Sequence, residues 1–500
     1  MDIKKGKLNV SVSIAFRIIT MVMAIVVKMV LVRICGNEVN GLNSLYLSII
    51  GVLSVAELGV GSAITFCMYK PIVEGDHDTV SALYHLFERL YLLIGAIIFL
   101  GGLIITPFLP HFAKDYTELS VNMYVTFLLI LASVTITFLF SAKTSLINAY
   151  KNNYITTAIT QGGVVFQYIL QIAVLFLSGS FVWYLVCRII AVVFQWIITE
   201  VITKRKYGVI INTKSKLDVA VKSKVKRNIK AMFMHKIGYA LVNTVDSIVI
   251  SAFVGVISLG EYSNYILILS SMTGVITLVF SSLTSVIGHL CVEEEKETVK
   301  KYCESFHLLN FLIGVVFFLG YYAVADNLIA VLFSSELIVS KSVSFVITLN
   351  GFIQFMRHST LMFKDATGSF YADRWKPLCE GICNIILSIL FVHFFGVVGV
   401  LIATIITTLL ICHIVEPYVL YKNAFGQSPQ KYYVKNYIMI FLFGITLLFV
   451  NGCLQSISNI WLQLLINGLI SVAFSIVLCA VVLLADRKLI RQLLRIIKRG

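Results

Sequence analysis

Charge is scarce in this sequence, and so is proline. Only 13% of the 500 residues are charged and 59% are hydrophobic, whereas soluble domains carry roughly 25% charged residues. Six prolines in the whole chain interrupt few of its apolar runs, and proline is the residue that most often ends or kinks a helix. This balance excludes a soluble globular domain, because such a domain has too little interior to bury so much apolar surface.

Motifs for metals, disulfides and nucleotides are missing as well. The ten cysteines are scattered, mostly inside apolar runs, and Cys379 and Cys383 merely lie one helical turn apart. We interpret them as small apolar residues. The sequence has no phosphate-binding glycine loop, and we expect no metal, no cofactor and no catalytic residue. The net charge of +15 does not indicate nucleic acid, because the basic residues stand between apolar runs.

What the chain does have is a series of apolar runs from Leu8 to Leu484. About 20 apolar residues are needed to cross roughly 30 Å of hydrocarbon as a helix. The runs do not alternate as barrel strands would, so they predict an all-α integral membrane protein with about 14 transmembrane helices. The expected helices are residues 9–34, 41–69, 86–108, 121–141, 154–177, 181–202, 231–254, 262–289, 305–325, 341–363, 377–395, 397–421, 435–453 and 459–484.

The basic residues predict the orientation, because short basic loops stay in the cytoplasm. Ten Lys or Arg residues lie between Lys204 and Lys230, against the single acidic residue Asp218, and six more follow Asp486. The loops expected outside carry almost none. We therefore predict a multi-pass protein of the plasma (inner) membrane with both termini in the cytoplasm. The tail 486–500 alternates apolar and basic residues; it either lies on the inner leaflet or serves to orient the last helix.

An internal repeat links the two halves of the chain. A shift of 219 residues places Gly41 on Gly260, Ser44 on Ser263 and Tyr46 on Tyr265 without gaps, and also Asn9 on Asn228, Arg17 on Lys236 and Ile18 on Ile237. Transporters are commonly built from such duplicated bundles. The predicted domains are an N-lobe (1–203), a basic cytoplasmic linker (204–230), a C-lobe (231–424), two C-terminal helices (425–485) and an amphipathic cytoplasmic tail (486–500).

Charged residues deep inside an apolar helix usually face a partner or a wet cavity, since a charge in hydrocarbon costs at least a few kcal/mol. Arg17 lies near the middle of the first helix, too deep for its head group to reach the surface easily. Ser13, Arg17, Thr20, Ala24 and Lys28 follow one another at helical spacing and form a stripe of small or polar groups. Lys28 stands near the outer end, so it either lines a cavity or extends to the interface.

The same pattern recurs in two helices of the second half. Lys236, Asn243 and Asp246 fall on one face of the seventh helix, and Gln354 and Arg357 on one face of the tenth. We predict that Arg17, Lys28, Lys236, Asn243, Gln354 and Arg357 contact a transported molecule. Deep cations in both lobes suit an anionic cargo such as a phosphate, which needs Lys or Arg to replace its lost hydration.

Two carboxylates in the apolar runs have two interpretations. Glu57 lies at mid-membrane depth beside Gly59 and Gly61. It either forms a structural ion pair with Arg17 or takes up an ion, H+ or Na+, that drives transport. Asp246 has the same two interpretations, with Lys236 as its candidate partner. Residue type and depth do not separate a coupling site from an ion pair.

Two stretches of the sequence resemble the Wzx-type oligosaccharide-lipid flippases, which belong to the multidrug/oligosaccharidyl-lipid/polysaccharide (MOP) exporter superfamily. They are the run from Ala56 to Ile64 followed by Tyr69-Lys70-Pro71, and the pattern Gly368-x4-Asp373-Arg374-x2-Pro377-x2-Glu380-x3-Asn384-x3-Ser388 followed by Gly396-x2-Gly399-x4-Thr404. The resemblance extends over nearly the whole chain. It implies a MATE-like fold of two six-helix lobes plus two C-terminal helices, with a cationic central cavity and alternating access.

The resemblance also implies a function. The expected cargo is an oligosaccharide repeat unit linked to a lipid diphosphate, such as undecaprenyl diphosphate. The protein would flip it from the cytoplasmic to the outer face for the synthesis of capsule, exopolysaccharide or O-antigen. A MATE-like antiporter of drugs or metabolites is the alternative with the same fold. A membrane polymerase or glycosyltransferase is the alternative of another class, but His111 and Asp115 are the only acid-base pair in an outer loop. We therefore expect a transporter and not an enzyme.

Overall fold

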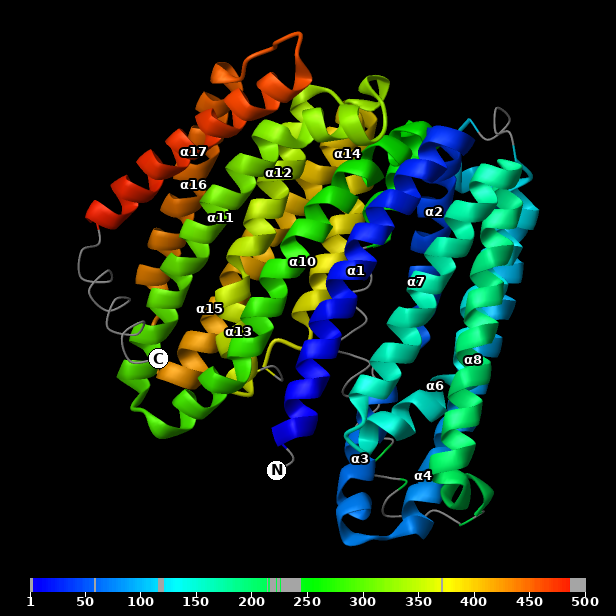
Figure 1. The fold of residues 1–500 in the computed structure, drawn as a ribbon. Helices are drawn as coiled ribbons and strands as arrows, with labels where there is room; N and C mark the ends of the chain where they lie inside the picture. Colours follow the sequence, from blue (N-terminus) through cyan, green and yellow to red (C-terminus); the bar gives the residue numbers. More distant parts are fainter. Residues whose placement is uncertain are drawn as a thin grey trace. The chain divides into compact units, whose positions relative to one another are not determined.

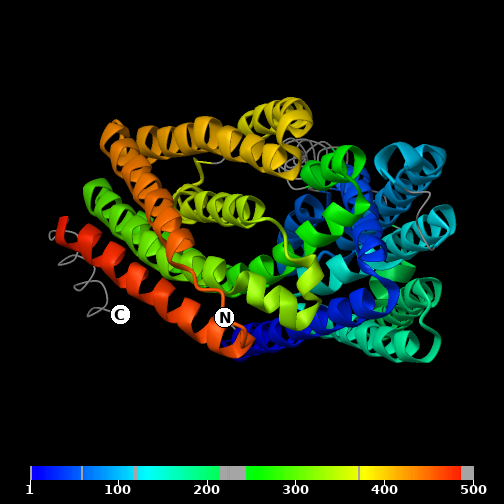
Figure 2. The same ribbon diagram turned by 90° about the horizontal axis from the view of Figure 1, so that it is seen from above.

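The structure is a computed structural model that describes residues 3–57, 60–115, 121–213, 244–369 and 372–485, together with residues 215, 222 and 225. The chain divides into two compact units, Met1–Gly260 and Glu261–Gly500. Figures 1 and 2 show their helices from two directions. Each unit is described by itself.

Unit 1 is a bundle of long helices. Its elements are α1 (Ile3–Cys35), α2 (Asn37–Leu53), a 3-10 turn (Ser54–Glu57), α3 (Val60–Glu74), α4 (His77–Ile105), the short α5 (Leu109–Phe112), α6 (Met123–Ala149), α7 (Asn153–Ser178), α8 (Phe181–Asn212), a π-helical turn (Ile250–Val254) and the first turn of α10 (Val256–Glu293). Helix α7 packs between α1 and α8, and α6 packs against α4 and α8. The pair α7 and α8 is successive in sequence and joined by a short connection, whereas α1 and α7 are far apart in sequence and meet only in the folded chain.

Unit 2 contains the rest of α10 and seven more helices. They are α11 (Lys296–Leu332), α12 (Lys341–Met356), α13 (His358–Ala366), α14 (Lys376–Thr407), α15 (His413–Leu420), α16 (Gln430–Cys453) and α17 (Ile460–Ala485). Two π-helical turns, Thr408–Cys412 and Tyr421–Phe425, flank α15. Helix α11 packs against α12, α13, α16 and α17, and Figure 2 shows α11, α16 and α17 running side by side.

The predicted all-helical membrane fold is confirmed. Within the described ranges, nine helices are long and apolar enough to cross a membrane. Several agree closely with the predicted segments: 154–177 corresponds to α7, and 459–484 to α17. The total of about fourteen spans and the lobe boundaries remain predictions, and most of the linker, all of 231–243 and the tail after 485 lie outside the described residues.

Two predicted helices are broken where polar residues lie inside them. The segment 41–69 forms α2, the 3-10 turn that ends at Glu57, and α3; the sequence there contains glycine, which lowers helix propensity by about 1 kcal/mol. The segment 341–363 breaks at Arg357, whose backbone N–H bonds to the carbonyl of Gln354. Conversely, α14 joins the predicted helix 377–395 to the first part of the predicted helix 397–421 across a kink at Gly396, where φ is 56°, a conformation that favours glycine. The rest of 397–421 forms the π-helical turn and α15.

The start of α2 packs against the first turn of α10 within unit 1. The side-chain amide of Asn37 donates to the carbonyl of Ile257 at 3.0 Å, and that of Asn40 donates to the carbonyl of Gly260 at 3.1 Å. These bonds tie the start of α2 to the first turn of α10. The repeat-related tyrosines are both fully buried: Tyr46 bonds to Met123 and Thr126, and Tyr265 to Asp326. Each unit therefore has one of the two tyrosines, buried and hydrogen-bonded but to different kinds of partner.

Candidate functional site: deep cations and an apolar groove

Arg17 lies on an exposed side of α1, among Ile14, Ile18 and Val22. Its guanidinium makes no ion pair or hydrogen bond with any described residue, and only its carbonyl accepts a bond, from the Thr20 hydroxyl at 3.1 Å. An ion pair between Arg17 and Glu57, one of the two predicted interpretations of that carboxylate, is not formed. No acid among the described residues therefore balances the charge of Arg17.

Glu57 ends the 3-10 turn between α2 and α3 and is half-buried. Tyr91 of α4 is close enough to interact with it electrostatically. Asp246 precedes the π-helical turn of unit 1 and is buried, with 9% of its surface exposed. Glu57 thus lies in an irregular part of its helix, whereas Asp246 lies in regular helical residues, four positions before the π-helical turn begins. Their role in ion coupling remains a prediction.

Arg357 stands at the junction of α12 and α13 and is held by carboxylates. Its Nε donates to Oε2 of Glu416 at 3.1 Å, and its Nη2 to Oε1 of Glu416 at 2.7 Å. A second acid, Glu380 of α14, lies 3.8 Å from Nη1. Lys376 forms ion pairs with both acids. Two cations and two carboxylates therefore form one buried network in unit 2, which we call the charge network.

Gln354 belongs to the edge of this network. Its side-chain oxygen accepts from Nη1 of Arg357 at 2.6 Å, and its amide donates to the hydroxyl of Thr408 at 2.8 Å. The structure thus brings together Gln354 and Arg357, as their helical spacing predicts. It also shows that acids inside unit 2 balance the charge of Arg357. Direct binding of the cargo by Arg357 stays a prediction. Lys236 and Asn243 lie outside the described residues.

Arg188 is a deep cation that the sequence prediction missed. It lies seven residues into α8, half-buried, and its side chain interacts electrostatically with the hydroxyls of Tyr184 and Tyr168. The signal was present in the sequence, because the depth rule that singles out Arg17 applies equally to an arginine inside the run 181–202. Lys28, which the sequence predicts to contact the transported molecule, is half-buried in α1.

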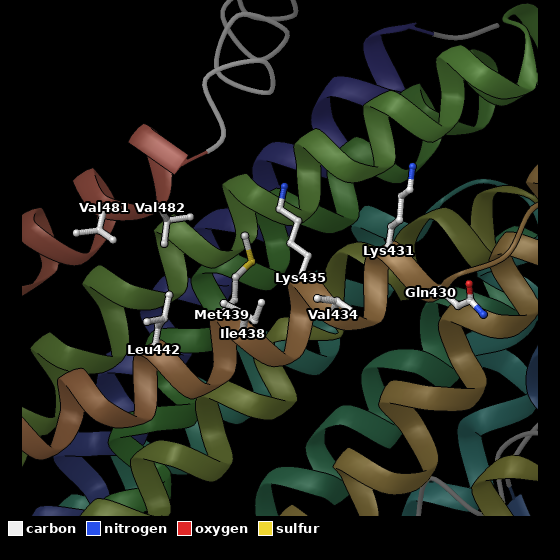
Figure 3. Close-up of a pocket in the computed structure, with 9 residues that line it drawn as sticks. All are labelled: Gln430, Lys431, Val434, Lys435, Ile438, Met439, Leu442, Val481 and Val482. Atoms are coloured by element: carbon white, nitrogen blue, oxygen red, sulfur yellow. The ribbon is translucent and has the colours of Figure 1, made fainter.

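An apolar groove of about 510 Å³ runs along α16 in unit 2. Four of its residues, Val434, Ile438, Met439 and Leu442, follow helical spacing, and Val481 and Val482 of α17 form the opposite side. Figure 3 shows Lys431 and Lys435 at one end of the groove, with both amines extending from the same side of α16. The groove therefore combines an apolar floor with a cationic mouth, a pattern that suits an anionic amphiphile.

No group of three or more potential metal ligands is formed by the His, Cys, Asp and Glu side chains in the ranges described above. Ion pairs and hydrogen bonds, not metal ligation, occupy the buried acids of unit 2. The chemistry that these side chains offer is the binding of charge and of apolar chains.

The long apolar helices are those of a polytopic membrane protein. Among solved structures, the lipid II flippase MurJ in an inward closed conformation has a TM-score of 0.64 at 15% identity, covering 96% of this chain and 99% of its own. An inward-facing multidrug resistance MATE transporter of the MOP superfamily has a TM-score of 0.60 at 11% identity, covering 87% of this chain and 98% of its own.

A third structure, a single-residue mutant of the Vibrio cholerae MATE transporter VcmN, has a TM-score of 0.56 at 13% identity and covers 85% of this chain and 99% of its own. No family model and no curated protein matches the sequence. At these identities the likeness shows the fold alone, and that fold is shared with the lipid II flippase MurJ and with two MATE transporters. Fold alone does not decide the cargo.

Proposed function

We propose that this protein flips an oligosaccharide linked to a lipid diphosphate from the cytoplasmic to the outer face of the plasma membrane. The observation that carries the proposal is Arg17, a cation deep in α1 whose guanidinium has no partner among the described residues. A diphosphate that leaves water needs such groups, because Arg matches two phosphate oxygens at once through its planar fork.

The two units differ in whether acids balance their deep cations, and this difference supports an anionic cargo. In unit 2, Arg357 and Lys376 are balanced by Glu380 and Glu416. In the described part of unit 1, Arg17 has no such acid. A cation left unbalanced at membrane depth costs several kcal/mol, and a cargo phosphate would remove that cost. The charge network of unit 2 is then structural, and unit 1 provides the attraction.

The groove on α16 supports a lipid carrier. An undecaprenyl chain is apolar along its whole length and is joined to an anion at one end. The groove repeats this order, with Val434, Ile438 and Leu442 along the floor and Lys431 and Lys435 at the mouth. We assign part of the apolar lipid chain to this groove.

Export needs no hydrolysis of phosphate in this proposal. With the cell interior negative, each negative charge moved outward gains roughly 2.3 kcal/mol per 100 mV. The two units rock to expose the head group first inside and then outside, with both termini in the cytoplasm. Glu57 and Asp246 are the candidates for H+ or Na+ coupling in this cycle.

The experiment measures sugar on the outer face of cells that lack their own exporter. Arg17→Ala should abolish export while folded protein stays in the membrane, and Arg17→Lys should keep part of it, since lysine keeps the charge but loses the fork. Arg33→Ala, an exposed position near the other end of α1, is the matched control and should export normally. Full export by Arg17→Ala at normal protein levels would overturn the proposal.

The alternative, a MATE-like antiporter, is favoured by the fold likeness to two MATE transporters. Such a protein would move cations or neutral drugs against H+ or Na+, so carboxylates and not Arg17 would bind the cargo. A drug-sensitivity assay separates the two: the antiporter alone would raise resistance to cationic drugs, and Arg17→Ala would leave that resistance unchanged.

A further inference from the structure

His413 is a buried histidine of unit 2 whose two ring nitrogens are both hydrogen-bonded. It begins α15, directly after the π-helical turn Thr408–Cys412, and 2% of its surface is exposed. Its Nε2 lies 3.1 Å from the carbonyl oxygen of Ile353, and its Nδ1 lies 3.0 Å from the side-chain nitrogen of Asn436. A carbonyl oxygen accepts and an amide nitrogen donates, so Nε2 carries the proton and the ring is neutral.

The side-chain amide of Asn436 can turn without giving up a bond at its oxygen. Asn436 is fully buried on α16, and its Oδ1 has no hydrogen-bond donor in the part of the chain that the structure describes. If the amide rotated by half a turn, Oδ1 would face Nδ1 of His413 and accept a hydrogen bond from a protonated ring. The pair therefore has two arrangements, one for the neutral ring and one for the imidazolium, and one bond joins amide and ring in each.

The carbonyl of Ile353 can accept from His413 because α12 ends at Arg357. In a regular helix this carbonyl would accept from the backbone N–H of Arg357, but that N–H bonds to the carbonyl of Gln354 instead, at 3.3 Å. The Nε2–H of His413 takes its place. Nε2 carries a proton in both the neutral and the charged ring, so this bond holds the ring while Nδ1 gains or loses a proton.

Charged and titratable groups of the surrounding elements face His413. They are Arg357 at the junction of α12 and α13, Lys376 of α14, Glu416 of α15 and His307 of α11, all close enough to interact with it electrostatically. On α16, Lys435 and Tyr432 in turn face His307. The two cations and two carboxylates of the charge network balance each other. A proton on His413 therefore adds an uncompensated charge to a buried site, which is unfavourable while the site is closed.

We propose that His413 binds a proton during the transport cycle and that Asn436 turns when the proton binds. A hydronium ion transfers its proton to the lone pair of Nδ1 and leaves as water, so that the imidazole becomes an imidazolium. H+ is then the coupling ion, because hard cations such as Na+ take oxygen ligands, whereas histidine ordinarily changes its charge between about pH 5 and 8. The inference rests on the proposed function and adds a proton site in unit 2 to the candidates Glu57 and Asp246.

The charge network links this proton to the conformation of unit 2. While Glu416 is bonded to Arg357 and water is excluded, the imidazolium has no counter-charge and the proton leaves. Glu416 lies three residues after His413, so both side chains are on one side of α15. Once Glu416 separates from Arg357 and water enters, its carboxylate balances the imidazolium and the proton binds. A ligand shifts a conformational equilibrium through the difference in its affinity for the two states, and this site gives H+ such a difference.

The export assay tests the coupling in intact cells, with nigericin to collapse the pH difference while the membrane potential is kept. Export by the native protein should fall several-fold under nigericin. His413→Gln should export more slowly, and nigericin should not change its rate, because glutamine keeps a polar side chain but takes up no proton. His393→Gln, at an exposed histidine of α14, is the matched control and should behave as the native protein does. Slower export by His413→Gln with an undiminished nigericin effect would indicate a structural role and overturn the proposal.

Nitrogen NMR of histidine-labelled full-length protein in detergent tests the site itself, with the signals of His413 identified by their loss in His413→Gln. Near neutral pH the native protein should carry the proton on Nε2 alone. Asn436→Asp should hold the imidazolium, since a carboxylate at that position only accepts. Asn310→Asp is the matched control and should leave His413 neutral, because Asn310 is a buried asparagine of α11 whose amide donates to the carbonyl of Phe355 at 3.0 Å. A neutral His413 in Asn436→Asp overturns the proposal.

The two measurements separate this proposal from the proposed function. If His413→Gln lowers the yield of folded protein, Asn436→Asp takes its place in the export assay, where a permanently bound proton should likewise remove the nigericin effect. If no sugar reaches the outer face of cells with the native protein, the proposed function fails, and the NMR measurement alone decides whether His413 and Asn436 bind a proton. If the native protein exports sugar equally with and without nigericin, the proposed function stands and proton coupling at His413 is overturned.

Discussion

Gly41 of α2 and Gly260 of α10 pack against each other's helices. A side chain at Gly41 would overlap the carbonyl oxygen of Val256, and one at Gly260 would overlap that of Asn37. The two glycines are 219 positions apart and are related by the repeat. The contact is therefore reciprocal, as expected where two copies of one motif meet, and backbone lies against backbone because neither position has a Cβ.

The first prediction follows from this contact. Gly41→Ala should destabilise the protein by about 1–3 kcal/mol, because the clashing atoms belong to backbone that cannot move aside. Thermal unfolding of the purified protein in detergent measures the change. Gly444→Ala is the control, since Gly444 is a glycine of α16 with open space around it. That substitution should be neutral or slightly stabilising. Equal melting temperatures for the two variants would contradict the predicted clash.

The length of the apolar runs was enough to predict the helices of unit 1 and unit 2, because crossing a bilayer requires long apolar segments whatever their partners are. It did not predict the breaks. Arg357 ends α12 where it meets Glu416, which lies 59 residues later and follows a π-helical turn. A pairing over that distance depends on how α12, α14 and α15 pack, and depth along one helix contains no information on packing.

The candidate site likewise has residues that the sequence singled out and contacts that it did not predict. Depth in the first helix singled out Arg17, whose guanidinium has no described partner, and its contact with a cargo stays a prediction. The sequence also identified Arg357, but depth did not reveal that Glu416 and Glu380 balance its charge. Arg188 was missed, although the same depth rule applied, and its face on α8 became clear only from the exposed residues around Trp183.

The second prediction concerns topology. In a variant without native cysteines, Asn212→Cys at the end of α8 should resist impermeant thiol reagents in intact cells, because the basic linker that follows keeps that end in the cytoplasm. Ser178→Cys at the end of α7 is the matched position on the opposite side and should be labelled readily. Labelling with the reverse pattern would invert the proposed orientation.

The third prediction separates structural charge from functional charge. Arg357→Met leaves Glu416 with Lys376 alone and should cost about 3–5 kcal/mol in stability, because a buried carboxylate loses a bonded partner. Adding Glu416→Gln restores the charge balance between Lys376 and Glu380 and should recover part of that loss. Unfolding in detergent measures both variants.

The control for the charge network is the ion pair between Lys70 and Glu74, which are 3.6 Å apart and largely exposed. Lys70→Ala should change stability by less than about 1 kcal/mol. Arg17→Ala, which removes a charge with no described partner, should not lower stability, although it abolishes export. If Arg357→Met were as stable as Lys70→Ala, the charge network would not be structural.

The last prediction tests the groove on α16 as the place of the lipid chain. Leu442→Trp adds a bulky ring to the apolar floor, so the chain can no longer lie there, and export should fall several-fold although Arg17 and the charge network are intact. Phe441→Trp is the matched control, because Phe441 is the neighbouring residue, is 67% exposed and does not line the groove.

A prenyl phosphate that carries a photoreactive group near its phosphate should crosslink to residues around Met439 in the native protein, and Leu442→Trp should suppress that product. Because the cationic mouth would still attract the phosphate, binding of inorganic pyrophosphate should be the same in both variants. Normal export and normal crosslinking by Leu442→Trp would show that the lipid chain lies elsewhere, in the bilayer or on another face.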